Sequence, residues 1–335
     1  MLIGAFKPPR AAARSGPGLG YILPMSLTLR LLGTSASRPT VERNVSSLAI
    51  HREGETLMFD CGEGTQRQMM RYGVSFALQD IFFTHMHADH LLGVIGLLRT
   101  MALQGRTELL RLWGPRGSRR VLKSAEAFGF ERMTFPLEII EVEAGQRVDR
   151  QGYSIAAFAV DHRGSSSLGF ALVEEDRKGR FNPDLARELG IPEGPLWGRI
   201  HRGMPITLDD GRVIEPSVLV GPQRAGRTVV ITGDTRPCQA TIDAARGADL
   251  LVHEATFGAD EAERAVETGH STALEAAQVA RDAGVERLVL THFSARYSRE
   301  ALELERQARH VFARSVVGKD GMEVEVPFRE AMAAT

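Results

Sequence analysis

The chain has 335 residues, of which 43% are hydrophobic, 25% charged and 6% aromatic, with 41 Lys and Arg against 42 Asp and Glu. These values are those of an ordinary globular protein, so they exclude fibrous and disordered chains and a protein coated with basic residues for nucleic-acid binding. At about 150 residues per domain, the length predicts two domains or one large two-layer domain.

No apolar run reaches the roughly 18–20 residues that a bilayer span needs, so we expect no membrane association. The two cysteines, Cys61 and Cys238, cannot build a disulfide framework and indicate a reducing, cytoplasmic location. Residues 1–24 are basic and rich in Gly and Pro, which interrupt the apolar core of a secretory signal. We expect a disordered extension there, with Met25 as an alternative start, followed by one folded unit over residues 25–335.

Short β-branched segments, bounded by Gly, Pro or polar residues, predict many strands along the chain. The expected strands are Leu27–Leu32, Ser46–His51, Thr56–Phe59, Ile81–Thr84, Leu109–Trp113, Leu137–Val142, Tyr153–Val160, Leu168–Val173, Thr228–Ile231, Asp249–Val252, Arg287–Leu290 and Met322–Val326. Helical periodicity occurs between them. The expected helices are Leu91–Leu103, Arg116–Phe128, Cys238–Arg246, Thr272–Ala283 and Arg299–Ala313. This mixture predicts packed sheets with helices outside.

Residues 174–213 break the pattern, because they have little periodicity and are punctuated by Gly and Pro. About forty residues without long elements are unusual within a compact domain. Such a segment is either a tolerated surface insertion or a functional one.

The densest chemical signal is Thr84-His85-Met86-His87-Ala88-Asp89-His90, which follows an apolar run. Residues two apart on an extended segment face the same way, so His85 and His87 can hold one ion together. Asp89 and His90 lie where a helix is expected to begin and can reach a second point nearby. Imidazole and carboxylate ligands at this density favour a divalent ion, zinc above all.

Further potential ligands follow other apolar runs: His162, Asp234, His253 with Glu254, and His292. Because α/β sheets gather their sites at the carboxyl ends of strands, these residues are expected to meet. The number of donors predicts two metals, with Asp234 between them. We expect His85, His87 and His162 at the first metal and Asp89, His90 and His292 at the second. Two such ions can polarise a phosphoryl group and activate water.

Glu254 and His270 form the expected general-acid pair, since a carboxylate beside an imidazole fixes its tautomer and raises its proton affinity. The plainer alternative for His270 is a residue that merely precedes a helix start at Thr272.

These motifs resemble the metallo-β-lactamase superfamily, and more closely the ribonuclease Z family of tRNA 3′-processing endonucleases. The narrower resemblance rests on four stretches beyond the histidine motif. They are Leu32–Ser35 with Pro39 to Ser47, Phe59–Gln66, His253–Phe257 followed by His270–Thr272, and Leu189–Pro195.

The resemblance implies an αββα sandwich with a protruding flexible arm at about residues 174–213 that binds the tRNA elbow. It implies a homodimer in which the arm of one subunit serves the active site of the other. It also implies two zinc ions per subunit, with catalytic residues Asp89, Glu254 and His270. The expected substrate contacts are Arg43, Asn44, Gly194, Pro195, Arg199 and Arg202.

The implied reaction removes the 3′ trailer from precursor tRNA, leaving a tRNA 3′-hydroxyl and a 5′-phosphate on the trailer. One departure is Val41, which occupies the usual lysine position of the substrate loop and bears on whether CCA-ended precursors are rejected. The alternatives are a hydrolase of small phosphodiesters or thioesters on the same scaffold, and an inactive tRNA-binding scaffold.

Overall fold

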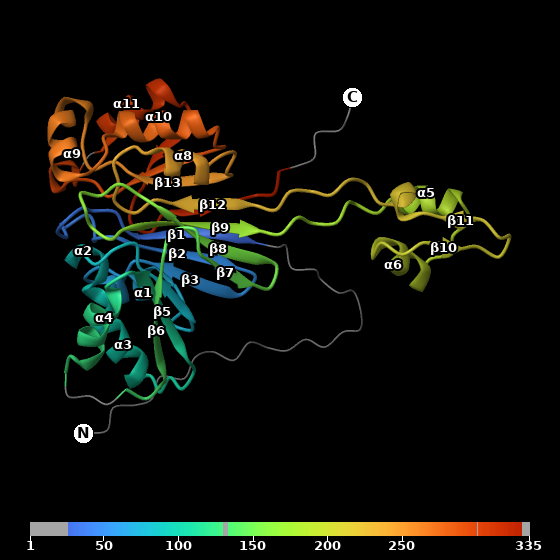
Figure 1. Ribbon diagram of the computed structural model, residues 1–335, viewed down its shortest axis with the longest axis horizontal. Coiled ribbons are helices and arrows are strands. Elements are labelled where there is room, and N and C mark those ends of the chain that lie inside the picture. The colour runs from blue at the N-terminus through green and yellow to red at the C-terminus, as the bar shows by residue number, and fades with distance from the viewer. Residues whose placement is uncertain (1–25, 130–132, 300, 330–335) are drawn as a thin grey trace.

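The computed structural model describes residues 26–129, 133–299 and 301–329, so the expected extension over residues 1–24 lies outside the described residues. Two seven-stranded sheets pack face to face and helices cover both outer faces, as Figure 1 shows. The expected αββα sandwich is therefore confirmed. None of the helices in the described ranges combines the length and the apolar character that a membrane span requires.

The first sheet has the order β16-β1-β2-β3-β4-β5-β6. In that order its strands are Glu323–Glu325, Leu27–Gly33, Ser47–Arg52, Glu55–Phe59, Asp80–Phe82, Leu110–Pro115 and Leu137–Val142. The second sheet has the order β15-β14-β13-β12-β9-β8-β7. Its strands are Ser315–Val317, Leu288–Thr291, Leu250–Glu254, Thr228–Ile231, Leu168–Glu174, Tyr153–Ala159 and Arg147–Arg150. Alternating apolar residues such as Leu29, Phe59, Phe170 and Val252 meet between the sheets in one buried core.

Two groups of helices enclose the sandwich, each with an apolar core against its sheet. The first sheet is covered by α1 (Thr65–Tyr72), α3 (Gly93–Leu103) and α4 (Ser118–Ala127). The second is covered by α8 (Gln239–Ala244), α10 (Ala273–Ala283) and α11 (Leu302–Val311). The remaining short helices of the body are α2 (Ala88–Leu91), α9 (Ala262–Thr268) and the 3₁₀ turns Ala259–Glu261 and Ala295–Tyr297.

The helix expected over Leu91–Leu103 is divided into α2 and α3. The division coincides with a close backbone approach, because a Cβ on Gly93 would lie 1.9 Å from the carbonyl oxygen of Gly62. The predicted helix start at Thr272 is confirmed by a complete capping box with Glu275. The short strands β7 and β15 and the helices α1 and α9 were not among the predicted elements.

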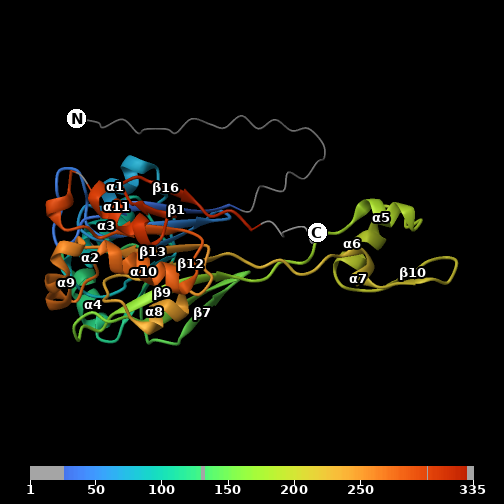
Figure 2. The ribbon, with the colours of Figure 1, turned by 90° about the horizontal axis from the view of Figure 1, so that it is seen from above.

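Residues following β9 form an arm that projects from the body in both ribbon views (Figures 1 and 2). It contains α5 (Pro183–Glu188), α6 (Pro195–His201), β10 (Ile206–Thr207), β11 (Val213–Ile214) and α7 (Pro216–Leu219). The expectation of a segment without long elements thus needs amending: the elements are short but enclose a small core of their own, which includes Ile191, Ile200 and Leu219. The arm also extends beyond Val213, to the β-bridge that Arg224 makes with Arg177.

Candidate metal centre

The candidate ligands lie at one edge of the sandwich because they follow strands that run in the same direction. β12, β13 and β14 are parallel neighbours, and Asp234, Glu254 and His292 lie at or just beyond their carboxyl ends. In the facing sheet, β4 ends shortly before His85 and His87. Residues more than 200 positions apart are thereby brought together, as expected for an α/β sheet edge.

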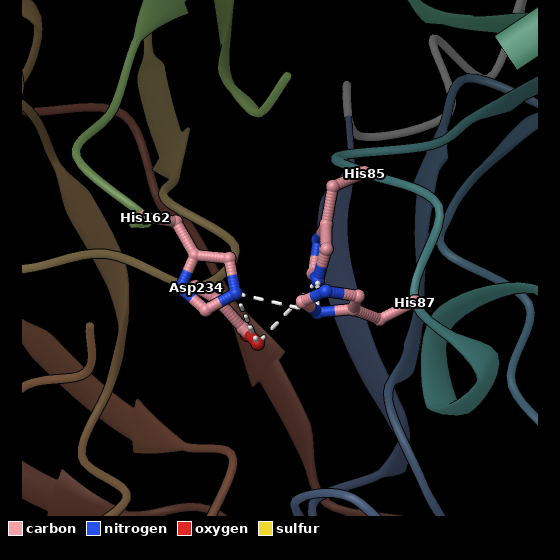
Figure 3. Close-up of side chains that lie close together, drawn as sticks. All are labelled: His85, His87, His162 and Asp234. Atoms are coloured by element: carbon pink, nitrogen blue, oxygen red, sulfur yellow. Dashed lines mark hydrogen bonds and ion pairs between the residues drawn. The ribbon is translucent and has the colours of Figure 1, made fainter. Parts of the chain in front are cut away.

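The first cluster contains His85, His87, His162 and Asp234, whose ligand atoms all lie within 4.8 Å of one another. Nδ1 of His87 lies 2.9 Å from Nε2 of His85 and 3.3 Å from Nε2 of His162. Figure 3 shows these ring nitrogens and the Asp234 carboxylate converging on one point. Several acceptor atoms around one point are the arrangement that a divalent cation requires.

The second cluster contains Asp89, His90 and His292. Nε2 of His292 lies 3.3 Å from Nε2 of His90 and 3.4 Å from Oδ2 of Asp89. The Asp234 carboxylate lies between the two clusters. Its Oδ1 is 3.3 Å from Nε2 of both His90 and His292, whereas its Oδ2 is 3.5 Å from Nε2 of His85.

Oδ1 of Asp234 is buried, and its near neighbours are the Nε2 atoms of His90 and His292, with which it makes no well-aligned hydrogen bond. A buried carboxylate oxygen without a partner is costly unless a cation compensates it. The side chains present therefore fit a pair of divalent metal ions bridged by Asp234.

Hydrogen bonds that Nδ1 donates orient three of the imidazoles. Nδ1 of His90 lies 2.7 Å from Oδ2 of Asp60, and Nδ1 of His162 lies 2.8 Å from the Gly269 carbonyl oxygen. Nδ1 of His292 lies 2.9 Å from Oγ1 of Thr256. Because each Nδ1 is engaged, Nε2 is the nitrogen left to face the centre, which is the usual arrangement for a metal-binding histidine.

Two of these residues have strained backbone. Asp60 and His292 have φ values of 56° and 59°, in the left-handed region that residues with side chains rarely adopt. Such strain persists where the surrounding structure fixes it, often at functional sites. Asp60 was not among the predicted site residues, although its position directly after the strand ending at Phe59 matches that of the other candidates.

The electrostatics favour the metal-binding protonation states of Asp234 and His85, whereas a metal ion would have to displace a proton from His90. Burial would lower the pKa of His90, but the charges of Asp234 and Asp60 outweigh it and hold the pKa well above its usual range. Burial alone would raise the pKa of Asp234, but the charges of His292, His90 and His85 outweigh it and hold the pKa well below its usual range. Burial, followed by repulsion from His90, lowers the pKa of His85. Ionised carboxylate and neutral imidazole are the forms that coordinate metal.

Glu254 and His270 adjoin the centre as a hydrogen-bonded pair. Nδ1 of His270 donates to Oε1 of Glu254 at 2.8 Å, and the same carboxylate accepts hydrogen bonds from Thr235 and Thr256. Burial would lower the pKa of His270, but the charge of Glu254 raises it to about 9. Together with Asp234 and His292, these two side chains form a third possible metal-binding group. The Glu254 oxygens are already occupied by donors, which favours the acid pair over metal coordination.

Two cavities flank His270 and form a groove across the centre. One, of about 460 Å³, is lined by Arg38, Phe257, Arg264 and other residues. The other, of about 490 Å³, is lined by Asp89 and Arg163 among others. Ser37, Thr268 and His270 line both cavities. The two cavities therefore adjoin at His270, beside the candidate metal ligands His87, Asp89 and His162.

The expected substrate contacts occupy two different environments. Arg43 is only 6% exposed. Its Nη1 donates to Oγ1 of Thr34 at 2.7 Å and to the Gly318 carbonyl at 2.8 Å. The guanidinium thus makes its contacts inside the protein, which supports a role in holding the loop over residues 39–47 in place. Asn44 lies beside it, and its carbonyl oxygen accepts hydrogen bonds from the Thr34 and Ser35 amides.

The other expected contacts lie on the arm, away from the metal centre. Gly194 and Pro195 begin α6, and Gly194 has a φ of 132° that favours glycine. Arg199 and Arg202 are exposed on α6 and at its end. The structure therefore does not bring these four residues to the centre of the same subunit.

Comparisons with known proteins agree on the scaffold. A family model described as "Anti-Pycsar protein Apyc1" matches residues 27–185, and one described as "Beta-lactamase superfamily domain" matches residues 205–293. The chain is 67% identical over 312 residues to a protein named Ribonuclease Z from Gemmatimonas aurantiaca, covering 93% of this chain and 99% of that one. It is 54% identical to Ribonuclease Z from Myxococcus xanthus, covering 91% and 99%. Among solved structures, human tRNase Z, short form, aligns with a TM-score of 0.64 at 26% identity over 90% of this chain and 100% of that one.

Proposed function

The chain belongs to the ribonuclease Z family, and we propose that it is a metal-dependent endoribonuclease that removes the 3′ trailer from precursor tRNA. The observation that carries this proposal is the division of the Asp234 carboxylate between two clusters, with the Glu254–His270 pair beside it. A two-metal arrangement beside a proton donor suits hydrolysis of a phosphodiester.

The proposed metals are two zinc ions per subunit. His85, His87 and His162 would hold the first, Asp89, His90 and His292 the second, and Asp234 would bridge them. Bound zinc would stabilise negative charge on the phosphoryl oxygens and make water nucleophilic near neutral pH. Manganese or iron are the alternatives for so nitrogen- and oxygen-rich a set of ligands.

The side chains of the chain supply orientation and proton transfer. Oδ2 of Asp89 accepts a hydrogen bond from the Ser37 amide at 2.6 Å, which fixes the carboxylate at the groove to orient the attacking water or accept its proton. His270, held by Glu254, donates a proton to the departing ribose 3′-oxygen. The products are a tRNA 3′-hydroxyl and a 5′-phosphate on the trailer.

The proposed homodimer is supported by where the arm leaves the body. β9 begins at Leu168, beside Thr84 at the metal-centre edge, and ends at Glu174, where the arm begins. Seven residues of strand span about 20 Å. The arm and α2, which carries Asp89 and His90, accordingly lie at opposite ends of the body (Figures 1 and 2). An arm that points away from its own centre suits a partner subunit's substrate.

Two smaller points belong to the same proposal. Val41 is 99% exposed, so the loop presents a neutral side chain to solvent where the family resemblance implies a lysine. We expect weaker rejection of CCA-ended precursors as a result. The free thiols Cys61 and Cys238 agree with a cytoplasmic location, where precursor tRNA is processed.

The test is incubation of the purified protein with an end-labelled precursor tRNA, with and without a chelator, followed by mapping of both new ends. We expect one cut 3′ of the discriminator nucleotide that chelation abolishes and zinc restores. Hydrolysis of small phosphodiesters without any cleavage of precursor tRNA would instead favour the small-molecule hydrolase. Absence of bound metal and of both activities would favour the inactive scaffold.

A further inference from the structure

The arm is joined to the body by two extended segments that form a narrow stalk. The Arg177 amide donates to the Arg224 carbonyl at 2.8 Å, and the Arg224 amide donates to the Arg177 carbonyl at 2.9 Å. The segments are in close backbone contact further out, where a Cβ on Gly179 would lie 1.7 Å from the Gly221 carbonyl oxygen. A lone two-stranded ribbon is marginally stable in water, so the direction of the arm needs support from its root.

That support is an aromatic ring at the root of the stalk. Phe328, beyond the last strand, contacts two guanidinium groups with its ring. Cζ of Arg177 is 3.2 Å and Cζ of Arg227 is 3.7 Å from the centroid of its ring. A cation over the face of an aromatic ring is attracted by the ring quadrupole, and the attraction grows when water is excluded.

The two arginines differ in how firmly they are fixed. Nε and Nη2 of Arg227 donate to the two oxygens of the buried Glu174 carboxylate at 2.7 and 2.8 Å, and its Nη1 donates to the Val326 carbonyl. Nε of Arg177 is buried and has no hydrogen-bond partner among the described residues. Burial, followed by the charges of Arg224 and Arg227, lowers the pKa of Arg177. The Phe328 ring therefore contacts both a cation at the root of the arm, whose Nε has no hydrogen-bond partner among the described residues, and a cation that Glu174 fixes in the body.

We propose that Phe328 is a positioning residue that sets the direction of the arm by holding Arg177 against the body. Without the ring, two like charges face each other across the root and the stalk pivots more freely. The arm would then meet precursor tRNA in fewer productive encounters, which weakens binding and leaves the metal centre unchanged. Only the RNA part of this inference rests on the proposed function.

The test compares Phe328→Ala, Phe328→Leu and Phe328→Tyr with the wild type, each as the full-length, metal-loaded protein. Phe328→Leu retains an apolar side chain without a ring, and Phe328→Tyr restores the ring. The readouts are hydrogen exchange at the Arg177 and Arg224 amides, KM and kcat for precursor tRNA, and hydrolysis of bis(p-nitrophenyl) phosphate.

We expect Phe328→Ala and Phe328→Leu to raise stalk exchange and the KM for precursor tRNA about tenfold, the scale of a desolvated cation–π contact. The kcat and the hydrolysis of the small ester should stay within about twofold of wild type, and Phe328→Tyr should behave as wild type. Wild-type exchange and KM in Phe328→Leu would overturn the positioning role, and so would equal losses on both substrates. Failure of the wild type to cleave precursor tRNA would overturn the proposed function instead, and the exchange data would still test the arm root.

Discussion

Oε1 of Glu254 lies 2.8 Å from Nδ1 of His270, and the same carboxylate is held by Thr235 and Thr256. The imidazole is thus fixed in orientation, and its Nε2 is the nitrogen left to act on a substrate in the groove. A proton donor at this position matters only when the leaving group needs a proton.

His270→Ala should therefore slow cleavage of precursor tRNA about 10²–10⁴-fold, the usual size of a general-acid contribution. Hydrolysis of bis(p-nitrophenyl) phosphate should fall far less, because nitrophenolate leaves without protonation. Rate measurements on both substrates check this, with His310→Ala, an exposed histidine on α11, as the control. Equal losses on the two substrates would contradict the acid role.

Asp89→Ala should abolish cleavage of precursor tRNA, because it removes both a proposed metal ligand and the carboxylate that orients water. Zinc content measured by elemental analysis should fall from about two toward about one per chain, since one cluster of ligands is then incomplete. Asp161→Asn is the matched control, because Asp161 adjoins His162 but is exposed and belongs to none of the candidate metal groups. A folded Asp89→Ala protein with near-normal turnover would refute the assignment.

Removal of the arm should impair cleavage of precursor tRNA while sparing hydrolysis of bis(p-nitrophenyl) phosphate. Residues 178–223 can be replaced by a short Gly-Ser turn, because Arg177 and Arg224 are already hydrogen-bonded neighbours at the root. We expect kcat/KM for precursor tRNA to fall by at least about 100-fold, because the arm's contacts with tRNA phosphates are lost. Hydrolysis of bis(p-nitrophenyl) phosphate should persist. The double variant Arg199→Ala, Arg202→Ala should give a smaller loss that is largest at low salt and shrinks as salt is added, because the variant makes fewer phosphate contacts. Parallel loss of both activities would indicate that the arm supports the body instead.

Glu174 forms a buried ion pair between the two sheets, and this ion pair makes the free energy of unfolding depend on pH. Nε of Arg52, on β2 of the first sheet, donates to Glu174 at the end of β9 at 2.8 Å. Burial would raise the pKa of Glu174, but the hydrogen bonds and charges of Arg227 and Arg52 outweigh it and lower the pKa. Glu174→Gln should lower the free energy of unfolding by about 3–5 kcal/mol at neutral pH, because two buried cations lose their counter-charge.

The sign of the pH effect follows from the lowered pKa. Stabilisation by ionised Glu174 is complete above its unfolded pKa of about 4.3 and is lost as pH falls through the lower folded value. The difference between wild type and Glu174→Gln in urea unfolding should therefore be constant from about pH 8 to 5 and shrink below about pH 4. A difference that grows on acidification would contradict this assignment.

The sandwich and the meeting of the candidate metal ligands at one edge could be predicted because each signal is local. His85, His162, Asp234 and His292 each come shortly after an apolar strand, and parallel strands carry such residues to one edge without further information. The Arg43 guanidinium could not be placed this way. Two of its partners, Ser298 and Gly318, lie more than 250 residues away in the sequence, so the local motif alone cannot distinguish a buried structural arginine from a substrate contact.

The elements of the arm and the edge strands of the sheets are harder to predict from the sequence, for a different reason. Elements such as β10, with two residues, are too short for any period to be visible, and their core at Ile200 and Leu219 forms only when several of them meet. β7 alternates between exposed and half-buried residues at a sheet edge and so lacks an apolar signal. The roles of Asp60 and Phe328 depend on contacts across the fold that no local pattern encodes.

The separation of arm and metal centre at opposite ends of β9 has a consequence for mixtures of chains. In the proposed homodimer, the arm of one subunit binds the tRNA that the other subunit cleaves. A chain without the arm therefore retains its metal centre but cannot bind tRNA for its partner. An Asp89→Ala chain retains the arm but has no active metal centre. Each homodimer should be inactive on precursor tRNA, yet co-refolding the two should restore up to about a quarter of wild-type activity if subunits assort at random. Dilution that dissociates the subunits should abolish this recovered cleavage, while the armless chain still hydrolyses the small ester. Cleavage of a large RNA would then be a property of the dimer, whereas phosphodiester hydrolysis would be a property of each chain.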